Sequence, residues 1–107
     1  MGEWRVDEQL MQSVAEQLMT AGVVIIPGQS VETRKTSRNR LRTARFTMDG
    51  RQYEAIEQNA DKPSRWGKLA RAGHRVVQFR DIETGKYVAV SVDGKVQVYG
   101  RLPSGRE

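Results

Sequence analysis

Residues 34–57 read RKTSRNRLRTARFTMDGRQYEAIE, so a basic run leads directly into a hairpin. The pair Asp49-Gly50 is typical of a two-residue type I′ turn, whose two central positions both need a positive φ. With the turn placed there, Phe46 faces Tyr53 across the strands, on a face that is apolar near the turn. A shift by one residue would set Phe46 against a glutamine, so the hydrophobic pattern favours a single register.

The same register pairs charges across the two strands. Arg45 falls opposite Glu54, and Arg42 falls opposite Glu57. Opposite charges that face each other across an antiparallel pair stabilise the sheet. These two arginines are therefore expected to be neutralised inside the hairpin, which leaves the other bases of the run without an evident partner.

A first helix is predicted between Asp7 and Gly22. Asp7 is a favourable N-cap, and glycine is the residue that most often ends a helix in the left-handed conformation. Leu10, Val14 and Leu18 recur at a spacing of four residues and form one apolar face. This face is expected to pack on a sheet.

The middle of the chain predicts a strand, a loop and a second helix. Residues 23–26 are short and entirely β-branched, which is typical of a buried strand. Residues 29–40 have no periodicity and are expected to form a basic loop or a frayed strand end. The second helix follows a capping acid at Asp61 and is expected to end at Gly73.

Residues 76–99 alternate in polarity and predict a three-stranded meander. A two-residue turn in its first hairpin sets Phe79 opposite Val90. In its second hairpin, a three-residue loop around Asp93-Gly94 is preferred, because it sets Val90 opposite Val96 and so pairs apolar side chains.

Together these elements predict one α+β domain over residues 1–107, in the order α-β-β-β-α-β-β-β. An antiparallel or mixed sheet of about six strands is expected, with two helices on one face. Residues 101–107 contain proline and glycine without periodicity and are expected to form a loose C-terminal tail.

Charge is distributed unevenly along the chain. The net charge is +5 over 107 residues, but residues 34–75 alone carry +8 and residues 1–33 carry −4. There is no cysteine, which excludes disulfides and cysteine-based metal sites and fits a cytoplasmic protein. No apolar run is long enough to cross a membrane, and the first residues do not resemble a signal peptide.

Catalysis is not expected. His74 is the only histidine, and it follows the second helix, where a capping or surface role is the simpler explanation. The acids are scattered, and the glycines match neither a phosphate loop nor a dinucleotide fingerprint. We therefore expect a binding module with no catalytic residues, no metal site and no cofactor.

Nucleic-acid binding is the sharpest hypothesis that the sequence supports. The candidates are bases in the loop and on or after the second helix, and arginine predominates among them, with a planar fork that suits phosphate. The candidate residues are Arg34, Lys35, Arg38, Arg40, Arg65, Lys68, Arg71 and Arg75. Whether loop and helix share one face is not evident from the sequence.

The alternative is a protein-interaction or homo-oligomeric assembly module. Residues 23–26 or 95–99 could present an edge strand to a partner sheet. The acidic first helix and the basic middle could also pair between copies, or with an acidic protein. Phe46, Tyr53 and Phe79 alternate with polar residues and are expected in the core rather than on a base-stacking surface.

Overall fold

The computed structural model describes residues 7–35, 41–58 and 65–99 of the chain. The expected α+β class is confirmed, and so is the order of helices and strands. The two helices are α1 (Glu8–Ala21) and α2 (Arg65–Arg71). The six strands are β1 (Glu32–Lys35), β2 (Arg42–Met48), β3 (Arg51–Glu57), β4 (Val76–Asp81), β5 (Tyr87–Val92) and β6 (Lys95–Val98). The cap predicted at Asp61 and the tail at 101–107 lie outside the described residues.

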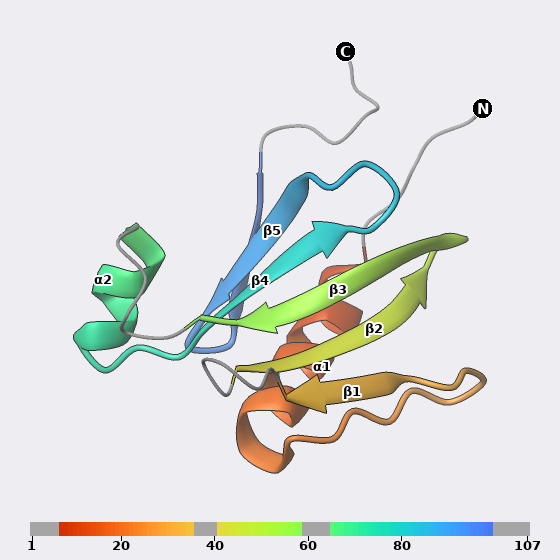
Figure 1. The fold of residues 1–107 in the computed structure, drawn as a ribbon, viewed down its shortest axis with the longest axis horizontal. Helices are drawn as coiled ribbons and strands as arrows, with labels where there is room; N and C mark the ends of the chain where they lie inside the picture. The colour runs from red at the N-terminus through yellow and green to blue at the C-terminus, as the bar shows by residue number, and fades with distance from the viewer. Residues whose placement is uncertain (1–6, 36–40, 59–64, 100–107) are drawn as a thin grey trace.

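The strands form one antiparallel sheet in which sequence neighbours are also neighbours in space, from β1 to β6 (Figure 1). In such a meander, each strand begins at the end of the sheet where the preceding strand stops. β1, β3 and β5 therefore end where β2, β4 and β6 begin, on the left of Figure 1. Both groups of candidate bases are attached near this end.

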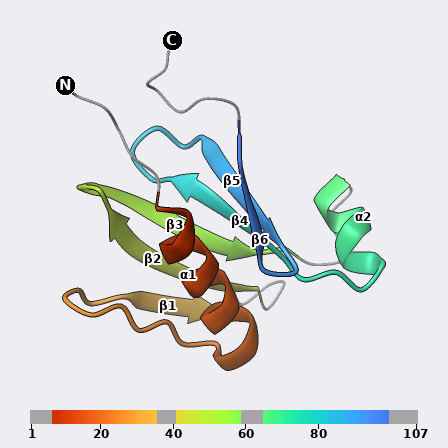
Figure 2. The same cartoon turned by 180° about the vertical axis from the view of Figure 1, so that it is seen from behind.

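Helix α1 lies across one face of the sheet, as Figure 2 shows. It begins at Asp7, whose carboxylate accepts the Leu10 N–H at 3.0 Å, and it ends at Gly22 with a φ of 72°. Its buried side chains pack on the aromatic face of the sheet, where Phe46 and Phe79 meet edge to face. Burial of this apolar area provides most of the driving force for folding.

The register predicted for the first hairpin is confirmed. Phe46 pairs with Tyr53, and Arg45 pairs with Glu54. The turn between β2 and β3 has positive φ at both central residues, as a type I′ turn requires.

The strand predicted at 23–26 is wrong, and β1 forms instead inside the segment expected to be a loop. The side chain of Gln17 partly explains why residues 23–26 do not form a strand. Its Oε1 accepts the Ile25 N–H at 2.8 Å, and its Nε2 donates to the Ile25 carbonyl at 3.3 Å. The helix thereby satisfies both backbone groups of Ile25, and the segment does not pair with the sheet. Val24 and Ile26 still point into the core.

The register expected between β4 and β5 is wrong by one residue. Phe79 pairs with Ala89, and a bulge follows it. The cause lies in the turn, where the buried Asp81 carboxylate accepts the backbone N–H groups of Glu83 and Thr84 at 2.8 and 3.3 Å. A side chain that organises the turn in this way lengthens the loop beyond two residues.

The three-residue loop expected between β5 and β6 is also wrong. Asp93 and Gly94 form a two-residue turn with φ values of 53° and 88°, so Val90 pairs with Gln97. This register is favoured because it turns Val96 and Val98 toward the core that α1 covers. Packing against the helix outweighs apolar pairing on the outer face of the sheet, which is the face opposite α1.

The expectation that both helices cover one face of the sheet holds for α1 but not for α2 (Figure 1). Helix α2 lies beyond the end of the sheet where β3 ends and β4 begins, and it packs chiefly on β4 (Figure 1). Its Trp66 stacks on Tyr99, whose hydroxyl accepts a hydrogen bond from Gln78 at 3.3 Å. Gln78 alternates with the core residues Val77 and Phe79 along β4, so it points to the face opposite α1. The α2 indole therefore reaches the outer face.

Candidate nucleic-acid interface

The topology brings the two groups of candidate bases to one end of the sheet. Lys35 closes β1 and pairs with Arg42 at the start of β2, while α2 lies between the end of β3 and the start of β4. Both groups therefore lie on the left of Figure 1. We call this the basic end; its described members are Arg34, Lys35, Arg65, Lys68, Arg71 and Arg75. The candidates Arg38 and Arg40 lie outside the described residues.

Arg34 has a partner that the sequence reasoning missed. Its Nε and Nη2 donate to one carboxylate oxygen of Glu32 at 2.9 and 2.7 Å. Residues two apart on a strand share a face, but this contact was not predicted because the segment was expected to be a loop. The Arg34 side chain is 69% exposed, so this ion pair is a weak one that a phosphate could displace.

Arg42 is neutralised, as the sequence predicts. Its guanidinium donates to both oxygens of Glu57 at 3.1 Å, and its backbone N–H donates to the same carboxylate at 3.0 Å. Burial alone would raise the pKa of Glu57, but the hydrogen bonds from Arg42 and the nearby charge of Lys35 lower it. Arg42 Nη2 also donates to the Met19 carbonyl at 3.2 Å, near the end of α1, where a cation suits the helix dipole.

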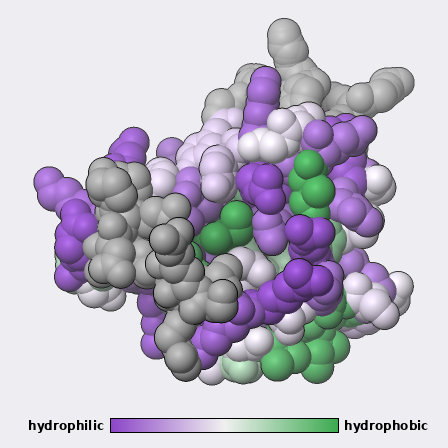
Figure 3. All heavy atoms as spheres, in the orientation of Figure 1, coloured by the Kyte–Doolittle hydropathy of each residue, from purple (hydrophilic) through white to green (hydrophobic). Residues whose placement is uncertain are grey.

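Arg45 is also paired, on the outer face of the sheet. Its Nε lies 3.6 Å from Glu54, which also accepts a hydrogen bond from Arg80 at 2.7 Å. Figure 3 shows this face, where hydrophilic side chains prevail. These two bases belong to the sheet surface rather than to the basic end.

The described part of α2 carries bases and no acid. Arg65, Lys68 and Arg71 are exposed, and no carboxylate of the described residues lies within ion-pair distance of Arg65 or Lys68. The helix ends as predicted at Gly73, which has a φ of 97°. The His74 N–H reaches back to the Leu69 carbonyl at 3.1 Å, as in a Schellman motif.

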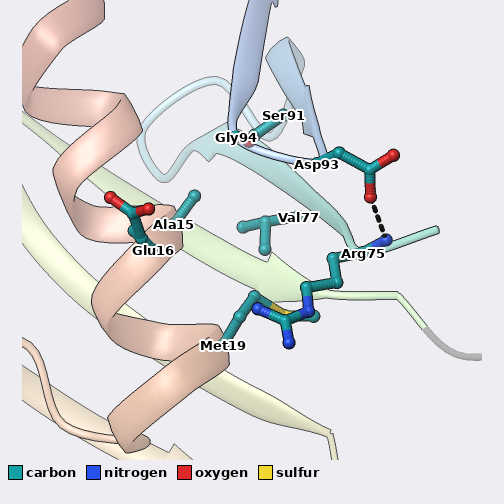
Figure 4. A pocket seen from close by; sticks show the side chains of 8 residues that line it. All are labelled: Ala15, Glu16, Met19, Arg75, Val77, Ser91, Asp93 and Gly94. Carbon is teal, nitrogen blue, oxygen red and sulfur yellow. Dashed lines mark hydrogen bonds between the residues drawn. The ribbon is translucent and has the colours of Figure 1, made fainter.

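Arg75 lies at the same end of the sheet but on the side of α1. It borders a cavity of about 280 Å³ between α1 and the turn that joins β5 to β6. In Figure 4 its side chain extends toward Met19, and its backbone N–H donates to Asp93 at 2.9 Å. The cavity lining is Ala15, Glu16, Met19, Arg75, Val77, Ser91, Asp93 and Gly94. Acids and a base share this lining, so it offers no uniform field for an anion.

His74 is paired with Asp93 and faces solvent. Its Nδ1 lies 2.7 Å from the Asp93 carboxylate. The Arg75 N–H and the His74 ring both lower the pKa of Asp93. Across the described ranges, no three histidine or acidic side chains are grouped in a way that could hold a metal ion. Neither described helix has the length and apolar character needed to cross a membrane.

Five of the six aromatic residues in the described ranges fall into two groups, and the sixth, Tyr87, is exposed. Phe46, Tyr53 and Phe79 are buried in the core, as the alternation predicts. Trp66 and Tyr99 instead stack beside the basic helix, with ring centroids 6.4 Å apart and planes inclined by 27°. The sequence reasoning did not find this pair, because α2 and the residue after β6 are distant in sequence and only the fold brings them together.

No known protein family, no curated protein and no solved structure matches this chain. The function is therefore inferred from the geometry of the chain itself.

Proposed function

We propose that the protein is a non-enzymatic module that binds nucleic acid through the basic end. One observation carries the proposal: two basic groups that are separate in sequence lie at one end of the sheet. Phosphate groups along a nucleic-acid backbone are the natural partner for such a surface, because their charge is dense and regularly spaced.

The balance of charge at this end supports the proposal. Arg42 is neutralised by Glu57, and Arg34 is held only by an exposed pair with Glu32. No described carboxylate lies within ion-pair distance of Lys35 or Lys68. These two lysines therefore form no ion pair within the described residues, and cations gathered at one end of the sheet raise the local potential.

The test compares two lysines at opposite ends of the sheet. Lys68→Glu reverses a charge at the basic end, whereas Lys86→Glu makes the same change in the turn between β4 and β5. Binding is measured by fluorescence anisotropy with labelled oligonucleotides. Lys68→Glu should weaken binding about tenfold, and Lys86→Glu should leave it nearly unchanged, since its charge lies far from the ligand beyond the screening distance.

Lys35→Glu extends this test to the other basic group. It should weaken binding as Lys68→Glu does, because a continuous strand of phosphates contacts both groups. With about four phosphate contacts, affinity should also fall roughly a hundredfold between 50 and 200 mM salt. Equal losses for Lys68→Glu and Lys86→Glu would contradict a localised interface and indicate attraction by net charge alone.

A second candidate function is contact with a protein partner. Val23 and Ile25 are 53% and 73% exposed, and the Gln17 amide holds this segment in place. Figure 3 shows a hydrophobic surface at the lower right, over the segment that joins α1 to β1 in Figure 1. Light scattering tests self-association: a dimer that Ile25→Asp abolishes supports this candidate, and a monomer at high concentration counts against self-association.

A further inference from the structure

We infer that Trp66 is a base-stacking residue that makes the interface selective for single-stranded nucleic acid. The inference rests on the proposed function and specifies its substrate class. It starts from an arrangement that charge alone does not explain: a half-buried indole within the basic helix α2, held in a fixed orientation at the surface.

The orientation of Trp66 is set by packing on the outer face. Its ring stacks on Tyr99, and the Tyr99 hydroxyl accepts a hydrogen bond from Gln78 of β4. Burial in this contact raises the pKa of Tyr99 above its ordinary value. The indole is thus supported by the sheet, although α2 is only one short helix.

A phosphate-binding group lies over this ring. The Arg65 guanidinium carbon is 4.8 Å from the centre of the Trp66 ring, which is a cation–π distance. Arg65 is exposed, so it can swing off the ring to contact a phosphate while an unpaired base takes its place over the indole. A nucleotide presents these same two features, a planar base and a charged phosphate, next to each other.

This combination distinguishes single strands from duplexes. Bases within a duplex are stacked on one another and cannot reach an indole on a protein surface, whereas an unpaired base can stack at little cost. Phosphate contacts from Lys68 and its neighbours would be similar for both ligands. The preference for single strands should therefore depend on Trp66 and not on the lysines.

The experiment uses Trp66 as its own probe. The chain has two tryptophans, so Trp4→Phe leaves Trp66 as the single indole. This variant is titrated with a single-stranded oligonucleotide and with a duplex of the same length at equal phosphate concentration. We expect the single strand to quench Trp66 fluorescence, and the duplex to bind more weakly without comparable quenching.

Two substitutions of Trp66 distinguish the loss of base stacking from the loss of the folded helix. Trp66→Ala should reduce single-strand affinity roughly five- to hundredfold, because one stacked base contact is lost, and should change duplex affinity little. Trp66→Phe keeps an aromatic ring and should retain most of the affinity. Circular dichroism of both variants checks that α2 persists.

The outcomes discriminate between the two proposals. Quenching together with a Trp66-dependent preference for single strands supports the inference. Equal binding of single strand and duplex, without quenching, overturns the role of Trp66 and leaves the nucleic-acid interface standing. Absence of binding to either ligand overturns both.

Discussion

At the scale of single residues, the most consequential charge is the carboxylate of Asp81. Its side chain is only 2% exposed, and one of its oxygens accepts hydrogen bonds from the Arg51 guanidinium at 3.1 and 2.8 Å. The other oxygen accepts the N–H groups of Glu83 and Thr84 and so shapes the turn after β4. A buried charge is tolerated because all of these donors face it.

The Asp81→Asn variant should lower the free energy of unfolding by roughly 2–4 kcal/mol at pH 7, because Arg51 loses its buried partner. Burial would raise the pKa of Asp81, but the hydrogen bonds from Arg51 and the backbone outweigh it and lower the pKa. The stabilisation is therefore present above the usual carboxyl pKa and is lost as pH falls through the lower, folded-state value. Denaturant unfolding at pH 7 and near pH 2 measures both effects.

The matched control is Glu83→Gln. Glu83 also lies near Arg51, at 3.7 Å, but its side chain is 77% exposed. Its removal should change stability by less than about 0.5 kcal/mol, as for most surface ion pairs. If Glu83→Gln lowered the free energy of unfolding as much as Asp81→Asn, burial of the carboxylate would not explain the stabilisation by Asp81.

At the scale of the elements, side-chain amides replace strand pairing at the sheet edge. Gln17 holds both backbone groups of Ile25, and Gln29 accepts the Thr47 N–H at 2.8 Å and donates to the Thr47 carbonyl at 3.0 Å. Each amide supplies one donor and one acceptor, as a neighbouring strand would. The chain between α1 and β1 is therefore ordered by two glutamines.

Gln17→Ala should release this segment. The Ile25 N–H loses its acceptor, so its hydrogen exchange should accelerate about tenfold or more, while the amides of β3 change little. NMR measures the exchange rates of the Ile25 and β3 amides. Ser13→Ala removes another contact of the same amide, 3.1 Å from Gln17 Nε2, and should leave the Ile25 amide protected.

The turn between β2 and β3 offers a test of backbone conformation alone. Gly50 has a φ of 77°, and a Cβ atom added there would meet nothing within 4 Å. Gly50→Ala should therefore cost about 1–2 kcal/mol through the left-handed conformation, without any clash. Gly50→Asn should cost less, because asparagine adopts this conformation more readily. Thermal unfolding of both variants gives the comparison, and equal losses would point to a cause other than φ.

At the scale of the whole molecule, stability and charge are distributed differently. Helix α1 and the central strands share the main core, whereas α2 packs chiefly on β4 and carries the bases of the proposed interface. A helix of seven residues is not stable by itself in water, so α2 depends on its contact with the sheet. The proposed binding element is thus the least anchored of the helices.

Local opening should follow this distribution. Amides in α2 should exchange much faster than those of β3 and β4, and binding of an oligonucleotide should slow exchange in α2 in particular. Hydrogen exchange with and without ligand measures both effects. Equal protection of α2 and the central strands in the free protein would contradict the prediction that α2 opens more readily.

The sequence by itself determined what depends on neighbouring residues. The β2–β3 hairpin and its charge pairs follow from one Asp-Gly turn and a period of two, and the limits of α1 follow from its caps and spacing. The order of the elements from β2 onward follows in the same way. Local backbone preference and side-chain alternation are properties of short segments, so they can be read without the rest of the chain.

The tertiary structure alone decided what depends on distant contacts. The position of β1 and the registers of β4 to β6 follow from packing on α1 and from polar side chains such as the buried Asp81 and the half-buried Gln17. The place of α2 follows from its packing on β4. The basic end exists for the same reason, because the antiparallel meander brings the end of β1 and α2 to the same end of the sheet. Contacts across the fold compete with local pairing preferences, and burial decides between them.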